Sequence, residues 1–188
     1  MSGNIDGADL SRLKNIRDKW EDFKFPVAGL RINPTTSKPD YDFVNGEFLF
    51  DPAATETVIG GDITNHSYKV PTAEWRPHIH WMQSQAGNVR WQLEYKIIPA
   101  GATEPASWTT ITTTTVAFTY TSGTIHQIST FPAINMTGFN SSATDVKVRI
   151  SRLGADALDT YAVDARFIQF DIHVVIDDFG STTEFGND

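Results

Sequence analysis

The stretch VRWQLEYKII at residues 89–98 decides the fold class, because apolar and polar residues alternate along it almost without a break. Successive side chains of a β-strand point to opposite faces, so one face of this stretch is apolar and the other is polar. Strands of a parallel α/β sheet are apolar on both faces. The stretch therefore predicts a strand of an antiparallel sheet that buries one face.

Similar short stretches, separated by turn residues, recur on both sides of this one. We expect further strands at residues 63–70, 75–82, 108–120, 125–131, 146–151 and 165–176. With residues 89–98 these make seven, and we expect about eight strands in all, a number typical of a sandwich. The sequence predicts an all-β fold, an antiparallel β-sandwich or jelly roll, over residues 57–188.

Residues 1–56 are expected to form a helix and an extended arm. An apolar stripe at spacings of three and four predicts a helix over residues 7–24 that Pro26 ends. This helix could lie on its own domain or dock on a partner, and its partner-binding candidates are Leu13, Ile16, Trp20, Phe23 and Phe25. In the arm at 26–56, Asn45-Gly46 predicts a two-residue hairpin turn, with Phe43 and Phe48 or Phe50 as buried anchors.

Composition excludes several classes of protein. The chain has 188 residues, no cysteine, a net charge of −8 and a pI of about 5.0. The acidic balance argues against binding to nucleic acid or to an anionic membrane surface, both of which attract Lys and Arg. Without cysteine there is no thiolate nucleophile and no disulfide. We see no signal peptide or membrane span, and expect synthesis in a cytoplasm.

His78 and His80, in the stretch RPHIHW at residues 76–81, are the candidate metal ligands. Two residues apart on a strand, they point to the same side. A cupin-like catalytic metal would need a carboxylate soon after the pair, where Ser84 and Gln85 stand, and a third imidazole from His126 or His173. If the chain forms a trimer, three pairs on its axis could instead hold one structural metal. The remaining interpretation is ordinary hydrogen bonding on a polar face.

Other chemistry has weaker signals. The sequence has no nucleophile elbow, no H-E-x-x-H and no phosphate loop, and no cofactor is implied. Asp171 and His173 share one face of the last expected strand and could pair.

Exposed aromatic residues could bind carbohydrate, and the candidates are Trp75, Trp81, Trp91 and Trp108. Trp81 and Trp91, however, fall in phase with core positions, which favours packing in the core for these two.

Several segments, taken in order, resemble a family of small virion structural proteins of tailed bacteriophages. The resemblance covers most of the chain and rests on residues 20–26, 33–34, 39–42, 76–81, 87–95, 159–161, 170–173 and 177–181, with Glu184. It implies a jelly-roll-like protein that forms trimers and serves as capsid cement or decoration, or as a collar protein near the portal.

The expected function is therefore that of a non-enzymatic structural component of a virion, made in the host cytoplasm. Its expected partners are two further copies of itself and the major capsid, portal or collar proteins, without nucleic acid or membrane. One alternative is a tail-associated module that binds a receptor or glycan. A less favoured alternative is a cupin-like metalloenzyme.

Overall fold

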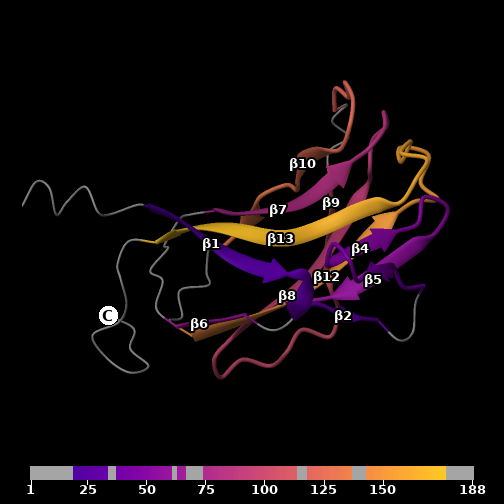
Figure 1. Ribbon diagram of the computed structural model, residues 1–188. Helices are drawn as coiled ribbons and strands as arrows, with labels where there is room; N and C mark the ends of the chain where they lie inside the picture. Colours follow the sequence, from indigo (N-terminus) through magenta and orange to yellow (C-terminus); the bar gives the residue numbers. More distant parts are fainter. Residues whose placement is uncertain are drawn as a thin grey trace, which may run out of the picture.

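The computed structural model describes residues 19–33, 37–60, 63–66, 74–113, 118–136 and 143–176, and these form two packed antiparallel sheets (Figure 1). The predicted β-sandwich is confirmed. Among the described residues the helical structure is a single 3-10 turn, η1 (Val27–Gly29). No helix in this part of the chain is long and apolar enough to cross a membrane.

The larger sheet has seven strands and follows the order β10-β7-β13-β4-β3, with β1 also paired to β13 and β11 to β7. Its strands are β1 (Lys19–Pro26), β3 (Asp40–Asp42), β4 (Glu47–Phe50), β7 (Glu74–Gln83), β10 (Ile125–Thr130), β11 (Ile134–Asn135) and β13 (Ala165–Ile176). In Figure 1, β1, β13 and β7 lie side by side in the layer nearest the reader.

The smaller sheet has six strands in the order β2-β5-β12-β8-β9, with β6 also paired to β12. Its strands are β2 (Arg31–Ile32), β5 (Thr55–Ile59), β6 (Ile63–His66), β8 (Trp91–Pro99), β9 (Thr109–Thr112) and β12 (Ala143–Leu153). The alternating stretch that predicted the fold is β8, and it pairs with β12 near the middle of this sheet.

The core lies between the two sheets and is rich in aromatic side chains. Trp81 from β7 and Trp91 from β8 are both fully buried, as their phase in the sequence predicted. Phe50 packs edge-on against Trp91, with ring centroids 5.2 Å apart. Inward residues of each strand alternate with outward ones, so the opposite face of the larger sheet carries a separate set of side chains.

The predicted helix over 7–24 is wrong for its last part, because residues 19–24 belong to β1. Phe23 and Phe25 alternate with Asp22 and Lys24, and this period-two pattern fits a strand that pairs with β13. Residues 7–18 lie outside the described part of the chain.

The predicted hairpin is present but its turn is longer than expected. Asp42 pairs with Glu47, so four residues rather than two connect β3 to β4. Phe48 and Phe50 are buried as predicted, whereas Phe43 is 89% exposed at the tip and is not an anchor. These strands of the expected arm belong to the larger sheet, and the expected domain boundary after residue 56 falls inside β5.

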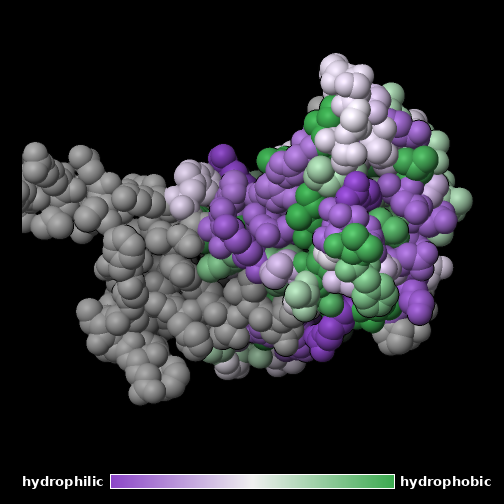
Figure 2. Space-filling model, in the orientation of Figure 1, coloured by the Kyte–Doolittle hydropathy of each residue, from purple (hydrophilic) through white to green (hydrophobic). Residues whose placement is uncertain are grey.

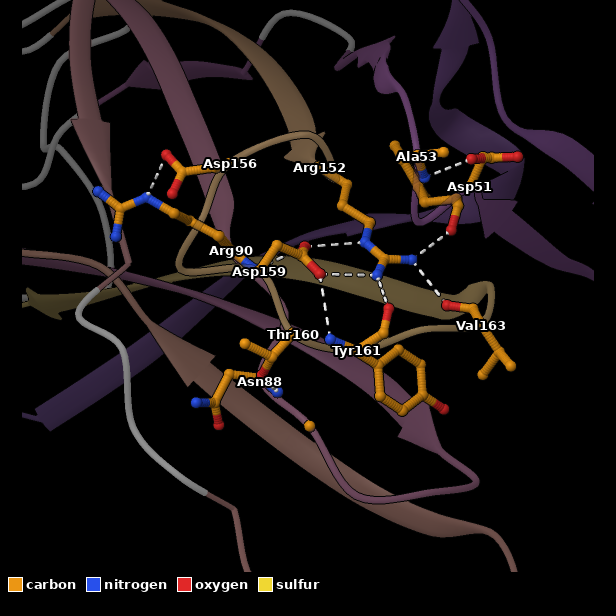
Figure 3. A network of polar contacts seen from close by, with 12 residues as sticks. Asp51, Ala53, Asn88, Arg90, Arg152, Asp156, Asp159, Thr160, Tyr161 and Val163 are labelled. Carbon is orange, nitrogen blue, oxygen red and sulfur yellow. Dashed lines mark hydrogen bonds and ion pairs between the residues drawn. The ribbon is translucent and has the colours of Figure 1, made fainter.

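A buried arginine fixes one end of the sandwich (Figure 3). Arg152 is fully buried, and its Nε and Nη2 donate to the two carboxylate oxygens of Asp159 at 2.9 and 2.8 Å. Its remaining N–H groups donate to the carbonyls of Phe50, Tyr161 and Val163. All five guanidinium donors are thus satisfied, and the loop after β12 is tied to the end of β4.

Candidate metal centre

β7 places two imidazoles on the outer face of the larger sheet. Ile79 and Trp81 point into the core and are fully buried, so His78 and His80 between and beside them point outward. The Nε2 atoms of the two histidines lie 3.1 Å apart. The strand therefore brings the sequence-predicted pair together as two nitrogen donors aimed at one point.

β13 supplies a carboxylate to the same point. Asp171 is the ladder partner of His78, and its Oδ2 lies 3.6 Å from Nε2 of His78 and 3.4 Å from Nε2 of His80. Its other oxygen, Oδ1, accepts a hydrogen bond of 2.9 Å from the side-chain amide of Gln169. Among the described residues, His78, His80 and Asp171 are the one group of three or more His, Cys, Asp or Glu residues with the spacing of metal ligands.

These three residues are largely removed from water although they lie on the outer face. His78 is 4% exposed and Asp171 is 3% exposed. Burial lowers the pKa of His78 below its ordinary value, and burial also lowers the pKa of His80, while the Asp171 carboxylate opposes both changes. The lowered pKa values favour the neutral imidazole, the form that carries a lone pair for a metal.

Two further histidines surround this group. Nε2 of His126, on β10, lies 2.8 Å from Nδ1 of His80. His173, on β13, packs against His78 with ring centroids 4.3 Å apart, and its Nε2 lies 2.9 Å from Asp22 of β1. Four of the chain's five histidines thus gather on one face.

The surroundings differ from the sequence-based expectations in three respects. His126 contacts the back of the His80 ring rather than the shared point, and His173 is engaged by Asp22 rather than by Asp171. At the position where a cupin-like site would have its carboxylate, Ser84 hydrogen-bonds to Tyr161. The carboxylate comes instead from Asp171, which sequence reasoning had not placed with the pair.

The predicted partner-binding residues divide between surface and core. Trp20 is 48% exposed on the outer face, where Arg76 lies over its ring at 4.8 Å. Phe23 packs edge-on against Trp75, and Phe25 is 4% exposed against Phe170. Phe25 therefore belongs to the core of its own chain and is not available to a partner. Leu13 and Ile16 lie outside the described residues.

The tryptophans that could have formed a carbohydrate platform are mostly internal. Trp75, like Trp81 and Trp91, is buried. Trp108 is partly buried, with the guanidinium of Arg149 over its ring at 4.0 Å and the ammonium of Lys96 at 5.1 Å. A sugar can stack only on an aromatic ring whose face is exposed. Three of the four candidate tryptophans are buried and do not meet this condition.

Comparison with known proteins adds no assignment: no protein-family model matches this sequence, and no curated protein matches it either.

Proposed function

We propose that this chain is a non-enzymatic structural component of a bacteriophage virion, a homotrimer that serves as a capsid decoration, cement or collar protein. The observation that carries the proposal is the convergence of three segments that resemble phage virion proteins. Residues 20–26, 76–81 and 170–173 are far apart in the sequence, yet they lie in β1, β7 and β13, which pair side by side. Together they make one continuous surface.

The chemistry of this surface suits a protein–protein contact. Trp20 is half-exposed and stacks with Arg76, and both residue types are enriched at the centres of interfaces. Asp22, His173 and Lys24 provide polar groups around them. Figure 2 shows hydrophilic side chains over the area where β1, β13 and β7 meet, and hydrophobic ones gathered over β4. An aromatic centre with a polar rim is the usual anatomy of an interface.

β1 adds a second feature that favours assembly. Within the described part of the chain it pairs with β13 alone, so its other edge carries backbone groups that a neighbouring chain could meet. We therefore place the contact with sibling subunits at β1 and Trp20. The major capsid, portal or collar proteins are the proposed partners in the particle, and the virion is the proposed location.

The test is the oligomeric state of the purified chain and of two variants. Wild-type protein should be a trimer in sedimentation experiments, and Trp20→Ser should shift it to monomers. The matched control is Phe43→Ser, because Phe43 is an even more exposed aromatic residue at the β3–β4 tip. A wild-type monomer at all concentrations, or loss of the trimer in the control alone, would contradict the proposed assembly. Mass spectrometry of purified phage particles should detect the chain, and its absence from particles would contradict the virion role.

A metal-dependent enzyme is the second candidate, and one observation favours it. Two histidines and one carboxylate on neighbouring strands leave coordination positions open for water or substrate. Such an enzyme would lose its turnover, but keep its fold and its oligomeric state, on Asp171→Asn.

A further inference from the structure

We infer that His78, His80 and Asp171 bind one zinc ion within each chain, which joins β7 to β13. The site does not depend on the proposed trimer or on a virion role. It also differs from a metal on a symmetry axis, because all three ligands come from a single chain and the carboxylate completes the set.

The donor spacing is the first support. Ligands of a tetrahedral zinc ion lie about 2.0–2.2 Å from the metal and hence about 3.3–3.6 Å from one another. The three distances in this group are 3.1, 3.4 and 3.6 Å. Hydrogen bonds between imidazole and carboxylate are normally shorter, about 2.7–2.9 Å. The two distances to the carboxylate are therefore too long for good ion pairs and match the spacing around a shared ion, and the 3.1 Å between the two nitrogens is slightly shorter than that spacing.

The second support is the set of hydrogen bonds behind the donors. Nδ1 of His78 lies 3.4 Å from the carbonyl oxygen of Arg76, and Nδ1 of His80 lies 2.8 Å from Nε2 of His126. Each Nδ1–H can thus donate outward, which leaves Nε2 of each ring as a lone pair. Oδ1 of Asp171 is held by Gln169. Metal-binding histidines and carboxylates are usually oriented by such outer hydrogen bonds.

Without an ion the same atoms are poorly satisfied. With both Nδ1 atoms protonated, Nε2 of His78, Nε2 of His80 and Oδ2 of Asp171 would be three acceptors that face one another without a proton, because each neutral imidazole carries only one. The Asp171 side chain is also buried, and a buried carboxylate is costly unless a positive charge lies beside it. Lys24, its ladder partner on β1, is directed to Asp22 instead, with Nζ 3.8 Å from that carboxylate. A divalent cation supplies the missing positive charge at the centre of the triangle.

Zinc fits this donor set better than magnesium or calcium, because imidazole nitrogens suit zinc and its neighbours in the transition series, whereas the other two ions prefer oxygen. Three protein ligands leave the fourth position to water. His80 has 20% of its side chain exposed, so this side of the triangle is the one open to solvent. The ion would link residues from distant parts of the sequence and so contribute directly to folding stability.

The experiment is a zinc titration of the metal-free full chain, with bound metal measured after removal of excess. Wild-type protein should bind one zinc per chain. Asp171→Asn and His80→Gln should each weaken binding at least about 100-fold. The matched control is His173→Gln, which changes a histidine of the same face that is not one of the three ligands, and its affinity should stay within a few-fold of wild type. Cobalt in place of zinc should give the visible absorption bands of a four-coordinate ion in wild type and in the control.

Folding is checked in the same series. In EDTA, Asp171→Asn should be at least as stable as wild type, because it removes a buried carboxylate to which no Lys or Arg of the described residues is paired. The inference is overturned if wild-type protein binds no zinc, if it binds one ion per three chains, or if His173→Gln loses binding as fully as His80→Gln.

Discussion

Asp171 and His78 face each other across the β7–β13 ladder, with Oδ2 3.6 Å from Nε2, and both side chains are buried on the outer face of the sheet. Core residues fill the opposite face of the same two strands. The larger sheet therefore has an apolar side that holds the sandwich together and a polar side on which a carboxylate and two imidazoles converge.

Zinc bound by His78, His80 and Asp171 should stabilise the folded chain. A ligand that binds only the native state, present at about 100 times its dissociation constant, adds about 2.7 kcal/mol to the free energy of unfolding. The midpoint temperature of thermal unfolding of wild-type protein should therefore rise with added zinc and fall back to its original value when EDTA removes the zinc. Asp171→Asn should show no shift, and a shift of equal size in this variant would mean that zinc binds elsewhere.

Replacing Arg152 by Met should destabilise the chain by about 3–5 kcal/mol, because Asp159 would be left as a buried, unpaired charge. The carbonyls of Phe50, Tyr161 and Val163 would also lose their donor. Urea unfolding measures the change. The matched control is Arg149→Met on the same strand, where the pair with Glu94 is wider, at 3.6 Å, and partly exposed, so we expect a loss of about 1 kcal/mol. Equal losses of stability in the two variants would contradict the proposed role of Arg152 in tying the loop after β12 to the end of β4.

Gly154 should not tolerate a side chain. A Cβ atom there would lie 2.6 Å from the backbone carbon and oxygen of Pro52, which cannot move aside as a flexible side chain can. Gly154→Ala should therefore cost about 1–3 kcal/mol of stability. Gly29→Ala is the comparison, because its nearest contact would be an ordinary 3.9 Å to Pro26, and it should change stability by less than about 0.5 kcal/mol. A smaller effect at Gly154 than at Gly29 would be inconsistent with the close approach of the two loops.

Glu56→Gln should change how stability depends on pH. Burial raises the pKa of Glu56, and the carboxylates of Asp51, Asp40 and Asp164 add to the rise, while a hydrogen bond from the Asp51 backbone opposes it. The folded state then binds the Glu56 proton more tightly than the unfolded state, whose pKa is about 4.3. Ionised Glu56 thus destabilises the fold at neutral pH, and this cost disappears as the pH falls through the raised pKa and the unfolded one.

The glutamine side chain carries no charge and can still accept the 2.7 Å bond from the Asp51 backbone. The gain in stability of Glu56→Gln over wild type should therefore be largest near pH 7 and shrink toward pH 4 in parallel urea titrations. A gain that stays constant over this range would show that the charge of Glu56 is not its source.

Much of the fold followed from local patterns. The alternation of apolar and polar residues predicted β8 and β13, because a strand that buries one face has an apolar residue at every second position. The same rule could have identified β1, where Phe23 and Phe25 point inward and Asp22 and Lys24 outward. The spacing of Trp20 and Phe23 also fits a helix, and pairing with β13, at the other end of the chain, decides between the two.

Only part of the candidate metal site could be predicted from the sequence, because spacing along a strand shows which side chains share a face but not which strands pair. That His78 and His80 share a face follows from their spacing, and so does the shared face of Asp171 and His173. Which of these residues meet depends on the register between β7 and β13, which places Asp171 opposite His78. Register is set by packing of the whole sheet, and no residue near the histidine pair in the sequence encodes it.

The most direct test of the metal centre is native mass spectrometry of the zinc-loaded chain, because it reads the number of subunits and the number of ions in the same particle. We expect a trimer that carries three zinc ions, and any monomer in the sample should carry one. Chains without metal, or one ion shared by three subunits, would contradict a zinc site formed by His78, His80 and Asp171 within each chain.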